Sequence, residues 1–218
     1  MSELYTDAKV HAFSRSQKKS DAENIVNHTI NYNDEVSIEQ AASQASKEAP
    51  LDIVIVATGI LFDGNITPEK SLRELSAKKF LRLFEVNTIL PALIAKHFLP
   101  KLNKQDRSIF AALSARVGSV SDNKLGGWYS YRASKSGLNM IIKNAAIEIN
   151  RQNKNAIIVG LHPGTVDSNL SKPFQGNVPD GKLFTPDYSV KRLLHVLGNL
   201  TPESSGRCFS WDGKEVQP

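Results

Sequence analysis

Apolar residues along this chain form two alternating patterns, short unbroken runs and longer stretches with helical spacing. Unbroken apolar runs of strand length predict strands that are buried on both faces of a parallel sheet. These runs cover residues 51–57, 108–113 and 156–161. Shorter segments with strand character lie at residues 9–13, 29–32 and 207–211.

Stretches with helical spacing separate these segments. They predict helices at residues 37–49, 76–98, 131–149 and 185–198. The first helix opens with a capping box of Ser37 and Gln40, and Pro91 is expected to bend the second. In the last helix, the residues expected to face the core are Val190, Leu193, Leu194 and Leu197.

Strands and helices therefore alternate along the whole chain. This order is typical of an α/β fold with a doubly wound, Rossmann-type parallel sheet, whose ligand sites lie beyond the carboxyl ends of its strands. The chain has 218 residues, of which 40% are hydrophobic, and we expect one domain over residues 1–218.

Composition and charge narrow the class of protein. The single cysteine, Cys208, excludes an internal disulfide and fits a reducing compartment, and no apolar run has the length of a signal peptide or a membrane span. The net charge is +5, but the basic residues are scattered and no aromatic residues interleave with them. We expect a cytoplasmic protein without a nucleic-acid partner, a membrane partner or a metal ion.

The most informative pair is Tyr131 and Lys135, in the segment WYSYRASKSGLN. Residues four apart lie one above the other on a helix. An ammonium group near a phenol favours the phenolate, so Lys135 is expected to lower the pKa of Tyr131 and let it exchange protons at neutral pH. The alternative interpretation is a tyrosine at the edge of the core beside a solvated lysine.

Other polar or small residues fall at the same edge of the predicted sheet. Arg15 follows the first strand, Gly59 follows the strand at 51–57, and Ser114 ends the strand at 108–113. Pro163 and Gly164 follow the strand at 156–161. Because carboxyl ends of parallel strands meet at one edge, we expect these residues to lie together.

With these residues in place, the chain resembles the short-chain dehydrogenase/reductase family. Residues 109–139 are most similar to the C-factor type of short-chain reductase, and residues 162–168 and 204–213 agree with that branch. The resemblance covers essentially the whole chain. It implies an NAD(P)-dependent oxidoreductase that reduces a carbonyl or oxidises an alcohol by hydride transfer.

The resemblance also implies a role for each matching residue. Tyr131 would be the general acid or base, and Lys135 would lower its pKa and hold the nicotinamide ribose. Asn87 would support a proton relay, and Ser114 would donate a hydrogen bond to the substrate oxygen. The implied cofactor-binding residues are Arg15, Asn31, Gly59, Tyr131, Lys135, Pro163, Gly164 and Val166.

The resemblance favours NADP over NAD. Arg15 would pair with the adenosine 2′-phosphate, since a guanidinium suits phosphate and no acidic residue stands there. The alternative for Arg15 is an exposed loop cation. Asn31 stands where the family often has an acidic residue that contacts adenine.

The position of the serine is open. The spacing from Ser114 to Tyr131 is longer than in most members of the family, and the loop with Gly126 and Gly127 would absorb the extra residues. One alignment places Ala115 at the serine position. Ser119 is therefore an alternative donor.

The start of the chain departs from the family. The expected first strand and glycine-rich turn, which receive the pyrophosphate, would lie before Leu4 and Tyr5, which look like the end of the first helix. That strand would sit between the strands at Val10 and Ile53. Its absence would leave both neighbours with unpaired backbone groups.

This departure leaves other functions open. One is a catalytically impaired binding or signalling protein of the same fold, and another is a fragment that does not fold alone.

The resemblance implies a homo-oligomer acting on a small-molecule carbonyl or alcohol. Residues 169–184 are expected to form a mobile loop over the pocket.

Overall fold

The computed structural model describes residues 7–16, 20, 22–64 and 66–218. The strands are β1 (Val10–Ser14), β2 (Ile25–Thr29), β3 (Ile53–Val56), β4 (Ser108–Leu113), β5 (Ala156–His162), β6 (Thr165–Val166), β7 (Leu183–Phe184), β8 (Cys208–Ser210) and β9 (Glu215–Val216). The α-helices are α1 (Glu35–Ala45), α2 (Ala77–Phe84), α3 (Leu90–Phe98), α4 (Tyr129–Ile149) and α5 (Pro186–Asn199). The shorter helical turns are η1 (Leu72–Glu74), η2 (Glu85–Ile89), η3 (Leu99–Lys101), η4 (Arg116–Gly118), η5 (Lys172–Asn177) and η6 (Pro202–Ser204).

The main sheet has five strands in the order β3-β4-β5-β8-β9. All neighbours are parallel except β8 and β9. Successive residues of β5 point to opposite faces, and both faces are covered: Ile157 and Leu161 belong to one apolar cluster and Ile158 to the other. This double burial explains why the central strands are unbroken apolar runs.

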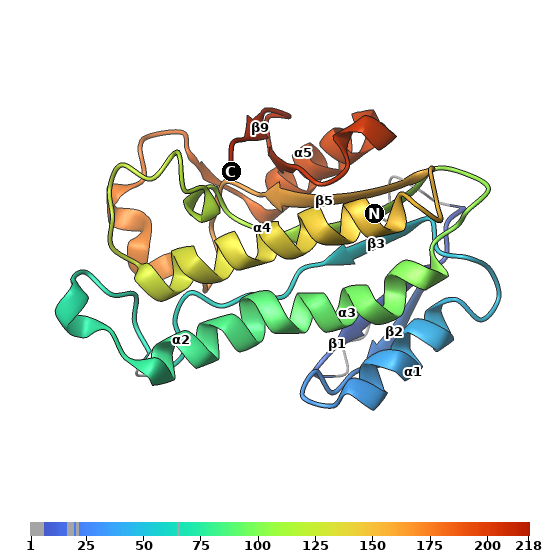
Figure 1. The fold of residues 1–218 in the computed structure, drawn as a ribbon, viewed down its shortest axis with the longest axis horizontal. Coiled ribbons are helices and arrows are strands. Elements are labelled where there is room, and N and C mark those ends of the chain that lie inside the picture. Colours follow the sequence, from blue (N-terminus) through green and yellow to red (C-terminus); the bar gives the residue numbers. More distant parts are fainter. Residues whose placement is uncertain (1–6, 17–19, 21, 65) are drawn as a thin grey trace.

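Helices cover both faces of this sheet. Buried residues of α1, α3 and α4 pack on one face, and those of α5 pack on the other. Figure 1 shows α3 and α4 lying side by side, with α5 apart from them. The prediction of a doubly wound Rossmann-type fold is confirmed.

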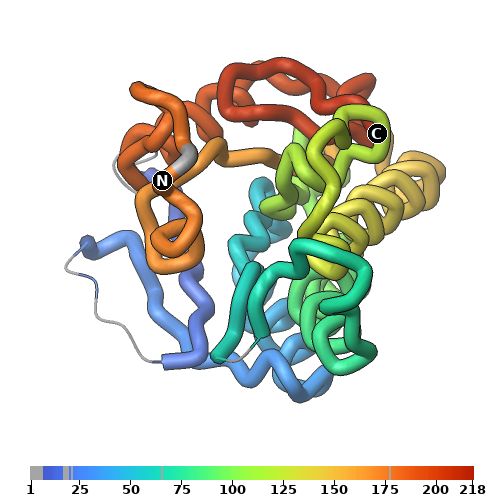
Figure 2. Tube along the Cα trace, turned by 90° about the vertical axis from the view of Figure 1, so that its left-hand side faces the viewer, coloured from blue at the N-terminus to red at the C-terminus, as the bar shows by residue number. Residues whose placement is uncertain are grey.

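The strands β1 and β2 form a separate parallel pair. This pair is joined to the same core by Phe13, whose ring meets the edge of Phe98 at a centroid distance of 6.3 Å. Among the described residues no strand lies between β1 and β3, and in Figure 2 the blue segment that contains β1 and β2 lies apart from the cyan segment that contains β3. The predicted helix end at Leu4 and Tyr5 lies outside the described residues.

Three local predictions need correction. The second strand spans Ile25–Thr29 and not residues 29–32. The cap of α1 is Asp34, which accepts from the Val36 N–H, whereas the Ser37 hydroxyl accepts from the Asn31 N–H. In α5, Val190 is 48% exposed, because Ser189 and Val196 occupy the buried stripe instead.

The helices α2 and α3 are one continuous helix interrupted by the π-turn η2. Pro91 follows this turn and has no N–H to donate to the carbonyl of Asn87, four residues earlier. The predicted bend at Pro91 therefore takes the form of a π-turn, a feature that often occurs at functional sites.

Candidate active site

The first turns of α4 carry the predicted pair. Tyr131 is 8% exposed and Lys135 is 3% exposed, so neither is a surface residue. The Lys135 Nζ lies 6.0 Å from the centroid of the Tyr131 ring and donates to the Leu113 carbonyl at 2.8 Å. The structure therefore brings the two side chains together at the carboxyl end of β4, and a solvated lysine is excluded.

Burial governs the pKa values of both groups. It raises the pKa of the Tyr131 phenol to about 12 and lowers the pKa of the Lys135 ammonium to about 8. The expected lowering of the Tyr131 pKa by Lys135 was wrong for this structure, because desolvation of the phenol outweighs any attraction from the ammonium. At pH 7 Tyr131 is a neutral proton donor and most of the Lys135 side chains are protonated.

Asn87 organises the loop that follows β3. Its side chain is fully buried; Oδ1 accepts from the Ile60 N–H at 2.8 Å, and Nδ2 donates to the Ile60 carbonyl at 2.9 Å. Nδ2 also lies 3.1 Å from the Ser134 hydroxyl. A Cβ on Gly59 would lie 3.4 Å from Lys135 Nζ and 3.5 Å from Asn87 Oδ1, so Gly59 leaves space directly beside both polar groups.

The two candidate serines, Ser114 and Ser119, both have hydrogen-bond partners other than Tyr131. The buried Ser114 donates its hydroxyl proton to Asn139 Oδ1 at 2.7 Å. Ser119 accepts from the Asp122 N–H and faces the Ser121 hydroxyl. Ala115, the residue after Ser114, packs against the apolar cluster that contains Tyr131. The structure does not bring the Ser114 hydroxyl to Tyr131 by a hydrogen bond.

The segment directly after β5, residues 163–166, packs closely against β7 and the start of α5. Gly164 has a φ of +77°, and a Cβ there would lie 2.6 Å from the Phe184 ring, so a side chain does not fit. The Pro163 carbonyl accepts from the Ser189 hydroxyl, and Val166 pairs with Phe184 between β6 and β7. These residues lie at the predicted edge of the sheet.

Arg15 and Asn31 stand at the ends of the separate pair of strands. Both are exposed, Arg15 directly after β1 and Asn31 two residues after β2. Burial raises the pKa of the Tyr32 phenol, and the nearby positive charge of Arg15 partly offsets that rise. The structure places this cation beside the end of β1, and no contact joins it to Tyr131 or Lys135 among the described residues.

An aromatic row that the sequence did not predict leads away from Tyr131. The Trp128 ring meets Tyr131 at 6.2 Å and Phe174 at 5.1 Å, and Phe174 meets Phe62 at 6.1 Å, all edge-on. Phe174 belongs to η5, in the segment between β6 and β7 that is orange in Figure 2. The predicted loop thus contacts the apolar surroundings of Tyr131.

Residues 4–178 match the family described as short chain dehydrogenase. The chain belongs to the short chain dehydrogenase family. It is 32% identical over 182 residues to a 1-hydroxy-2-glutathionyl-2-methyl-3-butene dehydrogenase from Rhodococcus sp. (strain AD45), covering 83% of this chain and 75% of that protein. It is 35% identical over 135 residues to C-signal from Myxococcus xanthus, covering 62% of this chain and 76% of that protein.

The fold agrees with solved members of the short chain dehydrogenase family. The structure of an NADPH-bound carbonyl reductase from chicken fatty liver matches with a TM-score of 0.80 and 28% identity, covering 96% of this chain and 87% of that one. The resemblance to the family, with relatives of the C-factor type, is confirmed, and the chain is an oxidoreductase of this family.

Three buried polar atoms at this edge were missed by sequence reasoning. Thr58 Oγ1, His162 Nδ1 and Ser210 Oγ have no hydrogen-bond partner among the described residues. They lie after β3, at the end of β5 and at the end of β8, respectively. Burial lowers the pKa of His162 to about 4, so its ring is neutral at pH 7. In a short chain dehydrogenase, unpaired groups at this edge are candidates to meet a ligand or water.

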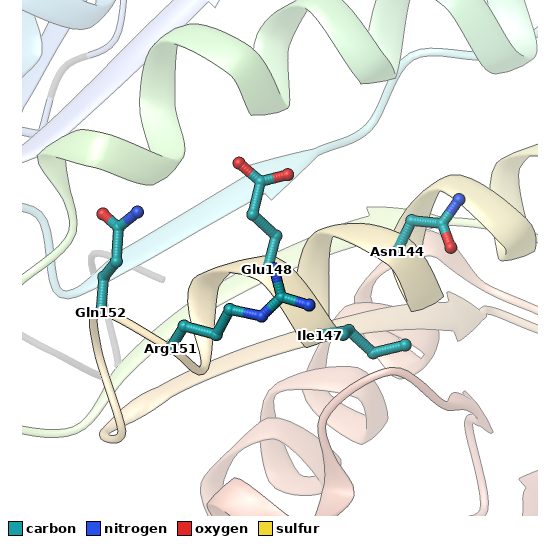
Figure 3. Close-up of a pocket in the computed structure, with 5 residues that line it drawn as sticks. All are labelled: Asn144, Ile147, Glu148, Arg151 and Gln152. Atoms are coloured by element: carbon teal, nitrogen blue, oxygen red, sulfur yellow. The ribbon is translucent and has the colours of Figure 1, made fainter.

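A hollow of this short chain dehydrogenase lies on the outer face of α4 (Figure 3). Its lining residues are Asn144, Ile147, Glu148, Arg151 and Gln152. Asn144 is 13 residues beyond Tyr131, or about 20 Å along a helix. This hollow is therefore separate from the candidate active site.

Two further findings concern ligands and membranes. Within the described ranges, no three His, Cys, Asp or Glu side chains cluster in a way that could hold a metal ion. In the same ranges, no helix combines the length and the apolar character needed to span a bilayer.

Proposed function

We propose that this chain is an NADP-dependent reductase or dehydrogenase that interconverts a small-molecule carbonyl and its alcohol, with Tyr131 as the general acid or base. The observation that carries this proposal is the buried pair of Tyr131 and Lys135 at the carboxyl edge of the sheet, with Gly59 leaving space beside the Lys135 ammonium. An ionisable pair held together in a desolvated site is typical of proton-transfer chemistry. We place the enzyme in the cytoplasm, where its free, buried Cys208 stays reduced.

The residues present fit the nicotinamide end of the cofactor. The unpaired Thr58 Oγ1 and the space at Gly59 lie after β3, and the close turn at Gly164 lies after β5. Lys135, Pro163 and Val166 would complete this part of the site. When bound, the cofactor supplies a hydride to the carbonyl carbon or accepts one from the alcohol.

The adenosine end rests on Arg15 and Asn31. The exposed guanidinium of Arg15 at the end of β1 suits a 2′-phosphate, which supports NADP over NAD. Asn31 would offer an amide to the adenine. A carbonyl reductase with 28% identity to this chain is NADPH-bound, and this relative supports the same preference.

In the reduction direction the chain's own groups move one proton. Tyr131 is neutral at pH 7 and donates its hydroxyl proton to the carbonyl oxygen. Lys135 is charged and stabilises the phenolate that remains. Asn87 keeps the loop at Ile60 in place and, with its backbone carbonyl left without a donor from Pro91, supports a relay through water.

We propose Ser114 as the donor to the substrate oxygen, with Ser119 as the alternative. Ser114 must first exchange its hydrogen bond to Asn139 for one to the substrate. Ser114→Ala and Ser119→Ala separate the two: the variant that lowers kcat by about tenfold or more identifies the donor. Equal activity of both variants and the wild type would remove serine from the proposal.

The test of the proposed function is consumption of NADPH with a panel of aldehydes and ketones. We expect turnover by the wild type and a loss of about a hundredfold or more in Tyr131→Phe. Tyr129→Phe is the matched control, two residues earlier on α4, and should keep nearly full activity. Equal rates for Tyr131→Phe and the wild type would contradict the proposal.

The second candidate is a binding or signalling protein that has lost catalysis. It is favoured by the separation of β1 and β2 from the main sheet, and the Myxococcus xanthus relative is named C-signal. This candidate predicts NADPH binding, seen as a change in cofactor fluorescence, without turnover of any carbonyl. Turnover that depends on Tyr131 would exclude it.

We also propose a homo-oligomer. Exposed apolar side chains lie on α2, η2 and α4: Leu81, Ile89, Met140 and Ile147. Because α2 and α4 pack against each other, a second copy could cover these side chains with its own pair of helices.

A further inference from the structure

The loop between β3 and α2 is tied to α4 on both sides of Tyr131. At one end of the loop, Asn87 holds Ile60 and lies 3.1 Å from the Ser134 hydroxyl, which donates to the Tyr131 carbonyl. At the other end, Glu69 reaches Ser130, the residue directly before Tyr131. The second tie has no counterpart in the roles that the sequence resemblance implied.

Glu69 makes this contact from a fully buried position. Its Oε1 accepts from the Ser130 hydroxyl at 2.6 Å, and its Oε2 accepts from the Ser130 N–H at 3.2 Å. A buried carboxylate is costly unless it is hydrogen-bonded. Here both oxygens are bonded, and the positive end of the helix dipole of α4 adds further compensation.

The start of α4 needs such a partner. The residue at its N-cap position, Trp128, makes no capping hydrogen bond with its side chain. Free N–H groups in the first turn must find acceptors elsewhere. Glu69 provides one from 61 residues away in the sequence, so it acts as an N-terminal cap from a distant loop.

The backbone of Glu69 fixes the same entry to the helix. Trp128 has a φ of +51°, and it is the one non-glycine residue with a positive φ among those described. This conformation is unfavourable for a bulky side chain and persists only where the surroundings impose it. The Trp128 N–H donates to the Glu69 carbonyl at 2.5 Å, and the preceding Gly126 and Gly127 also have positive φ.

We propose that Glu69 is a positioning residue for Tyr131, holding the first turn of α4 through Ser130 so that the phenol keeps one orientation. The inference rests on the proposed function, in which Tyr131 gives and takes the proton. Lys135 lies one turn further along and is held independently by the Leu113 carbonyl. Loss of the Glu69 side chain should therefore affect the proton donor more than the groups that hold the cofactor.

The experiment compares Glu69→Ala with Glu69→Gln in the full chain. A carboxamide can accept from the Ser130 N–H and donate to the Ser130 hydroxyl, so Glu69→Gln should stay within about threefold of the wild type in kcat. Glu69→Ala leaves the Ser130 N–H without its acceptor, and kcat should fall by about tenfold or more, because small misplacements of a catalytic group are costly. The KM for NADPH should change little in both variants.

Controls separate positioning from general instability. Glu39→Ala removes an exposed carboxylate of α1 and should leave kcat and KM unchanged. If Glu69 acts through Ser130, adding Ser130→Ala to Glu69→Ala should cost less than the sum of the single losses. Additive losses, or an equal fall of kcat in Glu69→Gln and Glu69→Ala, would overturn the proposal.

Amide hydrogen exchange tests the inference without turnover. Glu69→Ala should speed exchange at Ser130 and Tyr131 by about tenfold or more while the second half of α4 keeps its protection. Unchanged exchange at these two amides would overturn the role of Glu69 even in an active enzyme. Faster local exchange in a protein that reduces no carbonyl would confirm the cap and contradict the proposed function instead.

Discussion

At the scale of single residues, the site is governed by the removal of two ionisable groups from water. Tyr131 and Lys135 both shift toward their neutral forms, the phenol with a pKa of about 12 and the amine with a pKa of about 8. The neutral phenol is the form that can protonate a carbonyl oxygen. The partly destabilised ammonium gains most when a negative charge develops on Tyr131.

The pH dependence of reduction follows from the lysine. Lys135 must be charged to stabilise the phenolate, and its pKa is about 8. We expect kcat for carbonyl reduction to be constant below that pH and to fall as the pH rises through about 8. A profile of kcat against pH at saturating NADPH checks this, and constant activity up to pH values well above the Lys135 pKa would contradict it.

The buried ammonium of Lys135 should also lower the free energy of unfolding. Its pKa is about 8 in the folded protein, against an ordinary lysine pKa of 10.5. Between these values the unfolded chain binds more protons, so stability rises with pH there, and below about 8 the full penalty is present. Lys135→Met removes the charge but leaves the Leu113 carbonyl without its donor. We expect a net gain on the order of 1 kcal/mol in the free energy of unfolding at pH 7.

Denaturant unfolding at pH 7 measures this gain, with the exposed Lys104→Met as the control. The Lys135→Met variant should also lose turnover, which would make the site an example of stability exchanged for activity. A destabilised Lys135→Met protein would show that the ammonium has a stronger partner than Leu113.

The sequence predicted the residues whose relation is local or follows from strand ends. Tyr131 and Lys135 converge because they are four apart on one helix, and Gly59 joins them because β3 ends at the same edge as β4. The orientation of Ser114 could not be predicted, because it depends on which face of β4 meets Asn139 of α4. Glu69 was missed because no local pattern links it to a helix 61 residues later.

At the scale of elements, the segment between β6 and β7 is the proposed cover of the site. Its ends are joined by the pairing of Thr165 with Leu183 and of Val166 with Phe184, so the segment leaves the sheet and returns to the same point. Between these ends it places Phe174 against Trp128. This arrangement suits a cover over the substrate end of the site.

Phe174→Ala tests that role. The truncated ring should weaken binding of the carbonyl substrate, raising its KM by about threefold or more, while the KM for NADPH stays unchanged. Steady-state kinetics with each substrate varied in turn provide the two constants. Phe80→Ala, which removes a ring of α2 stacked on Phe84, is the control. A rise confined to the KM for NADPH would assign the segment to the cofactor instead.

Element boundaries show where local rules were enough. The unbroken apolar run at residues 108–113 predicted the bounds of β4 correctly. The helix predicted from residue 185 also begins there, with the Thr185 hydroxyl capping α5 by accepting from the Tyr188 N–H. The short pair β6–β7 was missed because two-residue strands have no periodic signal. The capping box at Ser37 failed because Asp34 captures the first turn and the Ser37 hydroxyl bonds to Asn31.

At the scale of the whole molecule, two sheets share one core. The proposed catalytic residues lie at the carboxyl edge of the larger sheet, on α4, on η2 and directly after β4. Arg15 directly follows β1, and the β1–β2 pair is joined to the core through Phe13 and Phe98. The alternation of apolar runs and periodic stretches predicted the α/β class. The gap between β1 and β3 was predicted from the family resemblance, because the strand expected between them is missing at the start of the chain.

The prediction at this scale is that the protein forms a homo-oligomer. If the outer faces of α2 and α4 form the contact, Met140→Lys should place a charge in it and reduce the mass in solution, because an unpaired charge in an apolar interface is costly. Light scattering after size-exclusion chromatography gives the mass. Val36→Lys, an equally exposed apolar position on α1, should leave the mass unchanged. An unchanged mass for Met140→Lys would move the contact elsewhere.

The most direct test of the central claim follows one hydrogen atom. The wild type and Tyr131→Phe are given NADPH that carries deuterium on the transferred position, and the deuterium on the product alcohol carbon is measured over time. We predict that the label appears on that carbon with the wild type and forms about a hundredfold more slowly with Tyr131→Phe. A product without the label, or equal rates for the two proteins, would contradict hydride transfer assisted by Tyr131.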